Sequence, residues 1–381
     1  MKEYIILRRE LPPARHALVG VRAVEADPSL TVERIPAHAL AELMGEPEVA
    51  LVAPRMPTHL IKPMAGKADP KAEPWGVETV AGRSRYTGAG VTVAVLDTGI
   101  DAEHPAFAGV ELVEKDFSGS GNGDAVGHGT HCAGVIFGRG LATRIGVAPG
   151  ISRALIGKVL DDKGGGSSEM IFEGMLWALE QRADIISMSL GFDFPGMVKR
   201  RTGQGWPVQL ATSEALEAYR GNLRMFDAIM AMTKARAAFG TSALVVAAAG
   251  NESRRQDDPD YRLAASLPAA ADDVISVAAL GRTSAGLFKV ADFSNTLATL
   301  SAPGVGITSA RTGGGLKTMS GSSMACPHVA GVAALWWEAI AASGKKANAR
   351  NVRAQLIATA RSEGFEQWDE VDMGQGVVVA P

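Results

Sequence analysis

Four residues that could together perform nucleophilic catalysis lie at the ends of apolar or glycine-rich stretches. Asp97 directly follows the apolar run Val91–Leu96, and Asn251 directly follows another such run. His128 and Ser323 each open a helix-length segment. A serine hydroxyl needs an adjacent base to attack near neutral pH, and histidine has a suitable pKa. A carboxylate can hold the imidazole in one tautomer, and an amide can donate to an oxyanion.

The elements around these residues predict a parallel sheet covered by helices. Short apolar runs alternate with helix-length segments; the runs are Val91–Leu96, Leu155–Leu160, Ala183–Met188 and Leu244–Ala249, and the segments are His128–Phe137, Ser168–Gln181 and Ser213–Ala238. Strands that are apolar on both faces are typical of a parallel sheet between two helical layers. In such sheets the active crevice lies at the carboxyl ends of the strands, where the four residues are expected to meet.

Length and composition exclude several classes of protein. A chain of 381 residues forms one large domain or two ordinary ones, and 46% apolar with 21% charged residues excludes a disordered chain. A net charge of −3 provides no basic surface for nucleic acid, and two cysteines exclude a disulfide scaffold. No apolar run approaches the ~18 residues of a membrane helix. Tyr4–Leu7 is too short for the core of a signal peptide.

The sequence divides into three parts. Residues 1–61 are predicted to form a small α+β unit with three strands and one short helix, at Tyr4–Leu7, Leu30–Ile35, Val49–Val52 and His38–Met44 respectively. Residues 62–74 hold three prolines and three lysines and nothing to bury, which predicts a linker. Residues 75–381 form the main domain.

Four segments of the main domain resemble signatures of the subtilisin-like serine proteases, the subtilases. Val93–Asp101 reads VAVLDTGID, His128–Gly134 reads HGTHCAG and Gly321–Gly331 reads GSSMACPHVAG, in the chain order of that family. Residues 246–252, VAAAGNE, resemble its oxyanion-asparagine segment. The resemblance runs from about Trp75 to about Leu356. It implies a three-layer α/β fold with a mostly parallel seven-stranded sheet, and peptide hydrolysis through an acyl-enzyme.

The resemblance also implies a role for each of the four residues. Asp97 would orient the imidazole, and His128 would act as general base and acid. Ser323 would be the nucleophile, while Asn251 would donate to the oxyanion beside the Ser323 N–H. This is the Asp-His-Ser triad of a serine endopeptidase.

Neighbouring residues in the same motifs are assigned structural roles. Gly321 would allow a tight turn before Ser323, and Gly129 would let its helix lie close to a neighbour. His131 lies one turn after His128, so the pair could also bind a metal. Because no acidic or cysteine cluster completes a ligand set, we expect a structural hydrogen bond for His131 and no metal site.

Two segments resemble the strands that lie on either side of a bound peptide. Met188–Gly191 (MSLG) would bind the substrate backbone, and Lys163–Gly166 (KGGG) would be the edge strand opposite. From these residues alone, without the four candidate catalytic residues, two glycine-rich loops are the preferred interpretation. Pro268 matches a family proline with a cis peptide bond beside the pocket. The expected substrate-binding residues are Gly164, Gly165, Gly166, Ser189, Leu190, Gly191, Glu252 and Ser266.

The sequence departs from the family at the calcium site of many secreted members. Ala106 stands where those members carry an aspartate, and the segment after HGTHCAG contains Arg139 and Arg144 but no carboxylate. Calcium prefers anionic and carbonyl oxygens, and two arginines would repel it. We therefore expect no required cofactor and no high-affinity calcium site, and weaker calcium sites elsewhere stay open.

Residues 192–240 are an insertion relative to compact members of the family. The second half is helix-like, with an apolar stripe formed by Leu216, Tyr219, Leu223, Phe226 and Met230. The favoured interpretation is one lengthened surface helix packed on the sheet. The alternative is that residues 192–207 form a flap over the non-primed part of the substrate groove, which lies upstream of the cleaved bond.

The N-terminal unit resembles a prodomain. Residues 41–61 are similar to the end of such a unit, with a helix, a turn, a strand and an extended tail that could lie in the active site like a product. This implies a zymogen that processes itself, with the prodomain as folding assistant and intramolecular inhibitor. Cleavage would fall between about Met56 and Pro74. An accessory α+β domain is the alternative.

The sequence therefore predicts a serine endopeptidase that acts on a peptide or protein substrate and binds neither nucleic acid nor membrane. One alternative is a dedicated processing protease of narrow specificity inside the cell, which the missing signal core and calcium loop favour. Another is an inactive binding protein on the same fold. A cytoplasmic location is expected, or a secreted one if a signal peptide has been removed.

Overall fold

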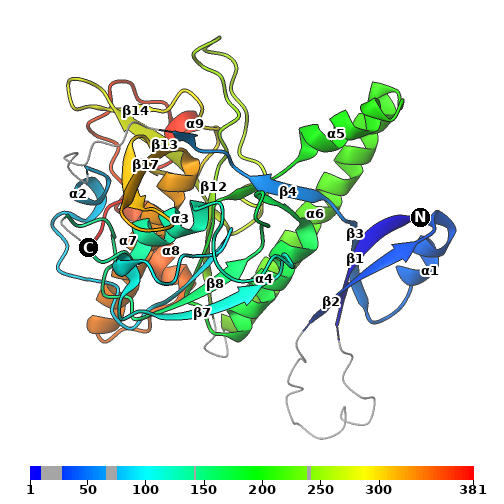
Figure 1. Cartoon of the computed structure of the whole chain (residues 1–381), viewed down its shortest axis with the longest axis horizontal. Helices are drawn as coiled ribbons and strands as arrows, with labels where there is room; N and C mark the ends of the chain where they lie inside the picture. Colours follow the sequence, from blue (N-terminus) through cyan, green and yellow to red (C-terminus); the bar gives the residue numbers. More distant parts are fainter. Residues whose placement is uncertain (10–27, 66–74, 141–142, 238–241) are drawn as a thin grey trace, which may run out of the picture.

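The computed structural model describes residues 1–9, 28–65, 75–140, 143–237 and 242–381. The chain forms a main body around one large sheet and a small N-terminal unit beside it (Figure 1). The segment between them crosses the surface of the main body in two short strands.

The N-terminal unit is an antiparallel sheet in the order β2-β1-β3. Its elements are β1 (Lys2–Arg8), β2 (Ser29–Ile35), η2 (Ala37–Ala39), α1 (Leu40–Leu43) and β3 (Val49–Pro54), which match the expected strands and helix. Successive side chains of a strand point to opposite faces. Tyr4 and Ile6 pack with Leu43 inside the unit, while Ile5 and Leu7 belong to the apolar core of the main body. The unit therefore shares a continuous core with the main body.

The central sheet confirms the predicted α/β fold. Its strand order is β14-β13-β12-β10-β6-β8-β7, with β15 paired to β13. The strands are β6 (Thr92–Asp97), β7 (Glu111–Asp116), β8 (Arg153–Lys158), β10 (Ile185–Met188), β12 (Leu244–Ala248), β13 (Ile275–Arg282), β14 (Phe288–Val290) and β15 (Leu300–Pro303). Every pairing is parallel except that of β14 with β13. The sheet has eight strands rather than seven, because β14 adds an antiparallel edge.

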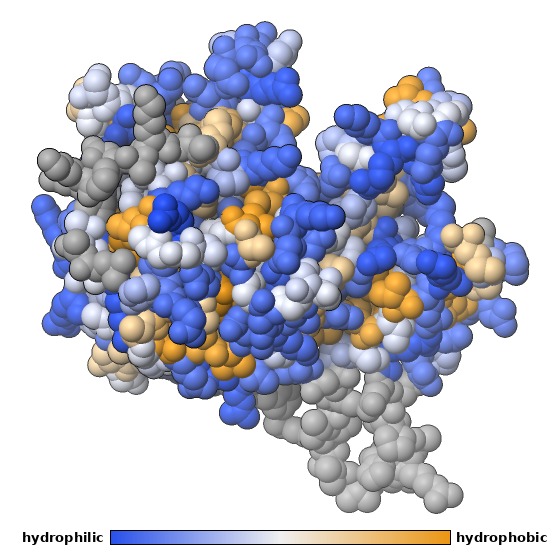
Figure 2. Space-filling view, viewed as in Figure 1, coloured by the Kyte–Doolittle hydropathy of each residue, from blue (hydrophilic) through white to orange (hydrophobic). Residues whose placement is uncertain are grey.

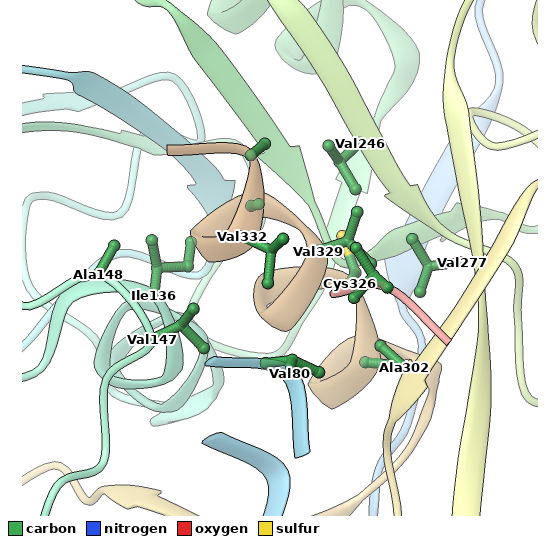
Figure 3. Close-up of a cluster of buried hydrophobic side chains, with 14 of the residues drawn as sticks. Val80, Ile136, Val147, Ala148, Val246, Val277, Ala302, Cys326, Val329 and Val332 are labelled. Atoms are coloured by element: carbon green, nitrogen blue, oxygen red, sulfur yellow. The ribbon is translucent and has the colours of Figure 1, made fainter. Parts of the chain in front are cut away.

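Helices cover both faces of this sheet. On one face lie α2 (Trp75–Ala81), α3 (His128–Phe137), α7 (Ser322–Ala342) and α8 (Ala349–Ala358); on the other lie α4 (Ser168–Glu180) and α6 (Val208–Arg236). The remaining short helices are η3 (Pro105–Phe107) and α9 (Glu370–Met373). Val93 and Val95 of β6 pack on the first face, while Ala94 and Leu96 pack on the second. Figure 3 shows α7 within the first layer, where Val329 lies beside Val246 and Val277.

The insertion at residues 192–240 forms a helical hairpin. Helix α5 (Phe194–Gly203) precedes α6, and the pair projects from the body beside the N-terminal unit (Figure 1). Residues 192–207 are thus mainly helical. The side chain of Asp193 explains the start of α5, because it accepts a hydrogen bond from the N–H of Gly196 at 2.8 Å.

The apolar stripe of α6 differs in part from the prediction. Phe226 and Met230 are buried, and Phe226 lies 4.8 Å from Phe172 of α4 between ring centroids. Leu216, however, is 46% exposed. The buried face at that end of the helix consists of small residues, Ala211, Ala215 and Ala218. Alanine gives a weak hydropathy signal, so the pattern assigned the larger leucine to the core.

Two small sheets hold the segment that leaves the N-terminal unit. Strand β4 (Pro57–Leu60) lies between β11 (Leu190–Phe192) and β9 (Gly165–Ser167). Strand β5 (Met64–Ala65) pairs with β17 (Leu316–Ser320), which also pairs with β16 (Ile307–Ala310). The predicted linker 62–74 therefore begins with residues that pair with the main body. Residues 66–74 lie outside the described part of the chain.

Figure 2 shows a mainly hydrophilic face with several separate apolar groups, one of them at the tip of the projecting hairpin at the upper right. Trp206, Val208 and Leu210 near the hairpin tip are each at least 40% exposed. Among the described helices, none combines the length and the apolar character that crossing a membrane requires.

Asp184, the residue before β10, should make the stability of the chain depend on pH. Burial raises the pKa of this carboxyl to about 6, although it accepts the N–H of Thr92 at 2.9 Å. The folded chain therefore favours the protonated carboxyl. Its contribution to the free energy of unfolding is fully present below about pH 4 and is lost as the pH rises through about 6. Asp184→Asn keeps an acceptor for Thr92 without the charge.

We expect Asp184→Asn to stabilise the chain by about 1–2 kcal/mol at pH 8 and to have little effect at pH 4. Thermal unfolding at the two pH values measures this difference. Asp257→Asn, which changes an exposed loop residue, is the matched control. Equal effects of Asp184→Asn at both pH values would contradict the assignment.

Candidate active site

The four residues singled out in the sequence lie at one edge of the central sheet. Asp97 ends β6, His128 begins α3, and Ser323 is the second residue of α7. Asn251 follows β12 after two further residues. Because β6 and β12 are parallel strands on either side of β10, their carboxyl ends meet at this edge.

Asp97 and His128 form a buried pair. Oδ1 of Asp97 lies 2.8 Å from Nδ1 of His128, and each residue is only 1% exposed. The same oxygen accepts the N–H of Thr98 at 2.7 Å, which fixes the carboxylate. The other ring nitrogen, Nε2, has no hydrogen-bond partner among the described residues. The imidazole is thus held from one side and has a free nitrogen on the other.

Ser323 and Asn251 lie beside the segment that follows β4. Ser323 Oγ donates to the carbonyl oxygens of Ile61 and Ser189, each at 3.4 Å. Asn251 Nδ2 donates to the carbonyl oxygen of Lys62 at 3.3 Å. The N–H and hydroxyl of Ser322 donate to Asn251 Oδ1 at 2.8 and 2.9 Å, and these bonds aim the amide nitrogen at the segment.

Two glycines permit close approach in this region. A Cβ at Gly129 would lie 2.1 Å from the carbonyl oxygen of Gly99, so only glycine lets α3 come this close, as expected. Gly321 has a different reason from the expected tight turn. Its φ of 164° is ordinary extended backbone, but a Cβ there would lie 2.8 Å from Nδ2 of Asn251. Glycine at this position leaves room for the amide.

Asp124 is a buried residue that the sequence analysis missed. Its carboxylate accepts hydrogen bonds from the hydroxyl of Thr98 at 2.8 Å and the N–H of Gly127 at 2.7 Å. It also accepts both the N–H and the hydroxyl of Thr130, at 2.8 and 2.7 Å. Asp124 thereby fixes the residues that flank His128. Its position four residues before the histidine in a glycine-rich stretch is the only sequence signal.

Neither cysteine forms a disulfide, and both are buried. The Sγ of Cys132 lies 3.8 Å from Nδ1 of His128, and together with Asp97 these groups could in principle surround a metal ion. However, burial raises the pKa of the Cys132 thiol well above its ordinary value, so the thiolate that a metal requires is disfavoured. The arrangement fits a hydrogen-bonded acid–imidazole pair better than a metal site.

His131 has the expected structural hydrogen bonds. Burial, followed by the nearby His128, lowers its pKa to about 3, so the ring is neutral. Its Nε2 lies 3.1 Å from the carbonyl oxygen of Ile307 and 3.0 Å from that of Lys317. The ring therefore ties α3 to the β16–β17 hairpin.

The glycine-rich segments expected to bind substrate form the two edges around β4. In β11, Leu190 pairs with Leu60 and Gly191 pairs with His59. On the other edge, Gly165 and Gly166 of β9 pair with His59 and Thr58, and Gly164 accepts the N–H of Leu60 at 2.9 Å. Both edges bind β4 in the antiparallel sense. The two edges therefore hold β4 as an extended segment by backbone hydrogen bonds.

The two other expected pocket residues, Glu252 and Ser266, differ in position: Glu252 lines a cavity and Ser266 does not lie beside it. Glu252 lines a cavity of about 730 Å³ together with Lys62 and Asn251, and its Oε2 accepts the amide of Asn295 at 2.7 Å. Ser266 lies behind the end of β12, where its N–H donates to the carbonyl oxygen of Ala249 at 3.4 Å. The Leu267–Pro268 bond is cis, as the resemblance implied.

Comparison with known proteins identifies the family. The subtilase family, Peptidase S8, matches residues 88–376. An intracellular serine protease of Paenibacillus polymyxa is 35% identical over 280 residues, which cover 69% of this chain and 72% of the relative. Subtilisin-like protease 6 of Trichophyton tonsurans is 34% identical over 272 residues, covering 68% of this chain and 57% of the relative.

A third relative, subtilisin-like protease 3 of Pseudogymnoascus destructans, is 33% identical over 285 residues, covering 68% of this chain and 58% of the relative. The chain thus spans less than three fifths of these two fungal relatives. The whole N-terminal unit and residues 62–87 lie outside the family match. The family match covers most of the chain, including Asp97, His128, Asn251 and Ser323. This chain therefore belongs to the subtilase family of serine endopeptidases.

Proposed function

We propose that this chain hydrolyses peptide bonds with Ser323 as nucleophile, and that residues 1–61 inhibit it until their C-terminal segment leaves the groove. The position of β4 is the observation that supports this most. The strand lies between β11 and β9, and it leads the carbonyl oxygen of Ile61 to 3.4 Å from Ser323 Oγ. A groove that holds extended backbone on both edges beside a serine and an imidazole suits the cleavage of a peptide.

Each of the four side chains has one task in the proposed mechanism. His128 Nε2 accepts the proton of Ser323 as Oγ bonds to the substrate carbonyl carbon. Asp97, through its bond to Nδ1, keeps the lone pair on Nε2. The amide of Asn251 donates to the oxyanion. When the C–N bond breaks, His128 gives its proton to the leaving amine, and water activated by the same imidazole then hydrolyses the acyl-enzyme.

The geometry around Ile61 supports inhibition rather than cleavage at this residue. Because Leu60 pairs with Leu190, Ile61 comes opposite Ser189, and the Ile61–Lys62 bond lies in front of Ser323. Yet Ser323 Oγ donates to the carbonyl oxygen of Ile61, and Asn251 donates to the next carbonyl, that of Lys62. The hydroxyl thus faces the oxygen and not the carbon, and the amide is bonded to a different carbonyl.

The hairpin and the N-terminal unit are joined by specific contacts. Asn222 Nδ2 of α6 donates to the carbonyl oxygen of Pro54 at 2.9 Å, and Lys2 Nζ lies 2.8 Å from the buried carboxylate of Glu214. A Cβ at Gly221 would approach Pro54 to 3.0 Å, so the helix backbone lies close to β3. We infer that the unit is a prodomain held by the hairpin, in preference to an unrelated accessory domain.

A dedicated processing role inside the cell is the second candidate. The relative from Paenibacillus polymyxa, named an intracellular serine protease, favours it. Cleavage of a peptide library distinguishes this role from that of a protease with broad specificity. A processing protease would cleave few sequences, whereas a protease of broad specificity would cleave many.

We propose that the high-affinity calcium site of secreted relatives is absent here. Ala106 is fully buried and offers no side-chain ligand. Arg144 donates to the carbonyl oxygens of Gly146 and Val147, at 3.1 and 2.7 Å, and Arg139 donates to that of Ala108 at 2.5 Å. Guanidinium groups thus bond carbonyl oxygens in this region, and these residues do not fit a calcium ion.

Chelation with excess EDTA is expected to leave the melting temperature and the activity unchanged. Arg144→Met, which removes the guanidinium, should lower the melting temperature by several degrees, because two buried carbonyls lose their donor. A large fall in melting temperature on chelation would contradict the proposal.

Intact mass of the purified wild-type chain, beside Ser323→Ala, tests the proposed function. We expect the wild type to lose its N-terminal part and the variant to stay whole. Since residues 57–60 and 64–65 are strand-paired, the cut should fall between Ala65 and Pro74. Identical cleavage of both chains would show that another protease is responsible. Two whole chains would favour a permanent N-terminal domain.

A further inference from the structure

The groove continues beyond β9 to the first turn of α4. Ser168 bonds the backbone of Met56 twice, since its N–H donates to the Met56 carbonyl oxygen at 2.8 Å and its Oγ accepts the Met56 N–H at 3.0 Å. Both bonds use only the peptide backbone of the bound segment. Any peptide that follows the path of residues 56–61 can therefore form them, whatever its sequence.

Beyond Met56, the side chain of Arg55 contacts Ser167 and Glu169 at the start of α4. The guanidinium donates to Ser167 Oγ at 2.9 Å and forms an ion pair with Glu169 Oε1. The Ser167 hydroxyl in turn donates to the same carboxylate oxygen at 2.5 Å. From the N-terminal unit itself, Glu3 Oε2 accepts the other guanidinium nitrogen at 2.8 Å.

Glu169 is a buried acid, and only one of its two carboxylate oxygens has partners among the described residues. It is 7% exposed, and its Oε2 has no hydrogen-bond partner among the described residues. The hydrogen bond from Arg55 is the main reason that the pKa of this guanidinium lies above its ordinary value. When the N-terminal unit leaves, the Glu169 carboxylate loses this cation, so the site favours another cation that restores the charge-assisted hydrogen bond.

We propose that Glu169, with Ser167, is a specificity subsite that binds an arginine or lysine side chain of the substrate six residues before the residue that faces Ser323. This inference depends on the proposed function. The spacing follows from the structure, because Ile61 faces Ser323 and Arg55 lies six residues earlier in the same extended segment. A guanidinium suits the subsite best, since it can bond Ser167 and Glu169 together.

The test uses the full-length chain with Arg55→Ala and Ile61→Asp, because an aspartate in place of the buried Ile61 should release the segment from the groove. Two quenched fluorescent peptides repeat residues 55–61 and continue with two alanines; one begins with arginine and the other with glutamine. We expect kcat/KM for the arginine peptide to be about tenfold higher. Adding Glu169→Gln should make kcat/KM equal for the two peptides. Should Arg55→Ala fail to fold, Arg55→Gln retains an amide donor and permits the same comparison.

Glu173→Gln is the matched control, because this exposed carboxylate lies one turn further along α4. It should preserve the preference for arginine. Equal rates for both peptides with Glu169 present, or a preference that survives Glu169→Gln, would overturn the proposal.

A binding measurement separates failure of this inference from failure of the proposed function. If no chain cleaves either peptide and Ser323 does not react with a fluorophosphonate, the peptidase proposal fails. Fluorescence anisotropy with the inert Arg55→Ala/Ile61→Asp/Ser323→Ala chain, in which the segment should no longer fill the groove, still tests the subsite. About tenfold tighter binding of the arginine peptide supports it, whereas equal binding or no binding overturns it.

Discussion

Ser323→Ala is expected to lower kcat/KM on a peptide substrate by at least about 10⁴-fold. The hydroxyl is the proposed nucleophile, and the imidazole of His128 is its proposed base. Its two hydrogen bonds are long, at 3.4 Å each, so their loss should change the melting temperature by only a few degrees. Steady-state rates after identical activation of both proteins, together with thermal unfolding, measure the two effects.

Ser301→Ala is the matched control for this prediction. Ser301 lies in β15, is fully buried, and has an Oγ without a hydrogen-bond partner among the described residues. Its removal should leave kcat/KM within about twofold of wild type. A Ser323→Ala protein that retains a tenth or more of wild-type activity would contradict the proposed mechanism.

Release of the proposed inhibitory segment, residues 57–62, from the groove should have the second largest effect on activity. Ile61 is 2% exposed and its side chain lies close to Gly191. An aspartate at this position would bury a charge while the segment is bound but not after release, which costs about 2–4 kcal/mol. Since each 1.4 kcal/mol is a factor of ten, Ile61→Asp should raise the activity of the unprocessed chain by about 30-fold or more.

The control introduces the same charge elsewhere in the N-terminal unit. Val32 of β2 is 41% exposed, so Val32→Asp should leave the initial rate unchanged. Rates are measured on a small chromogenic peptide within the first minutes, before any change in intact mass. If Ile61→Asp and wild type were equally active while both stayed whole, the segment would not be the inhibitor.

Much of the fold could be predicted from the sequence, because both faces of the central sheet are buried. Val93 and Val95 lie on one face and Ala94 and Leu96 on the other, which gives the continuous apolar runs that indicated a parallel sheet. The edge strand β14 could not be predicted in this way. It has only three residues, Phe288–Val290, and an exposed lysine interrupts its apolar pattern.

The sequence placed the four candidate residues at strand and helix ends, and the structure brings Asp97 and His128 into direct contact. What the sequence could not predict depends on contacts between distant segments. The carboxylate of Asp124 connects the residues after Asp97 with those around His128. Likewise, the pairing of Arg55 with Glu169 requires the path of the whole N-terminal segment, which no local pattern contains.

Mass spectrometry of the fluorophosphonate adduct tests the central claim most directly. The full-length chain and a sample freed of its N-terminal segment are treated alike, digested, and searched for the modified serine. We predict one adduct, on Ser323, that forms at least tenfold faster once the segment is gone. An adduct on another serine, no adduct in either sample, or equal rates in both would contradict the account of a serine peptidase inhibited by its own N-terminal segment.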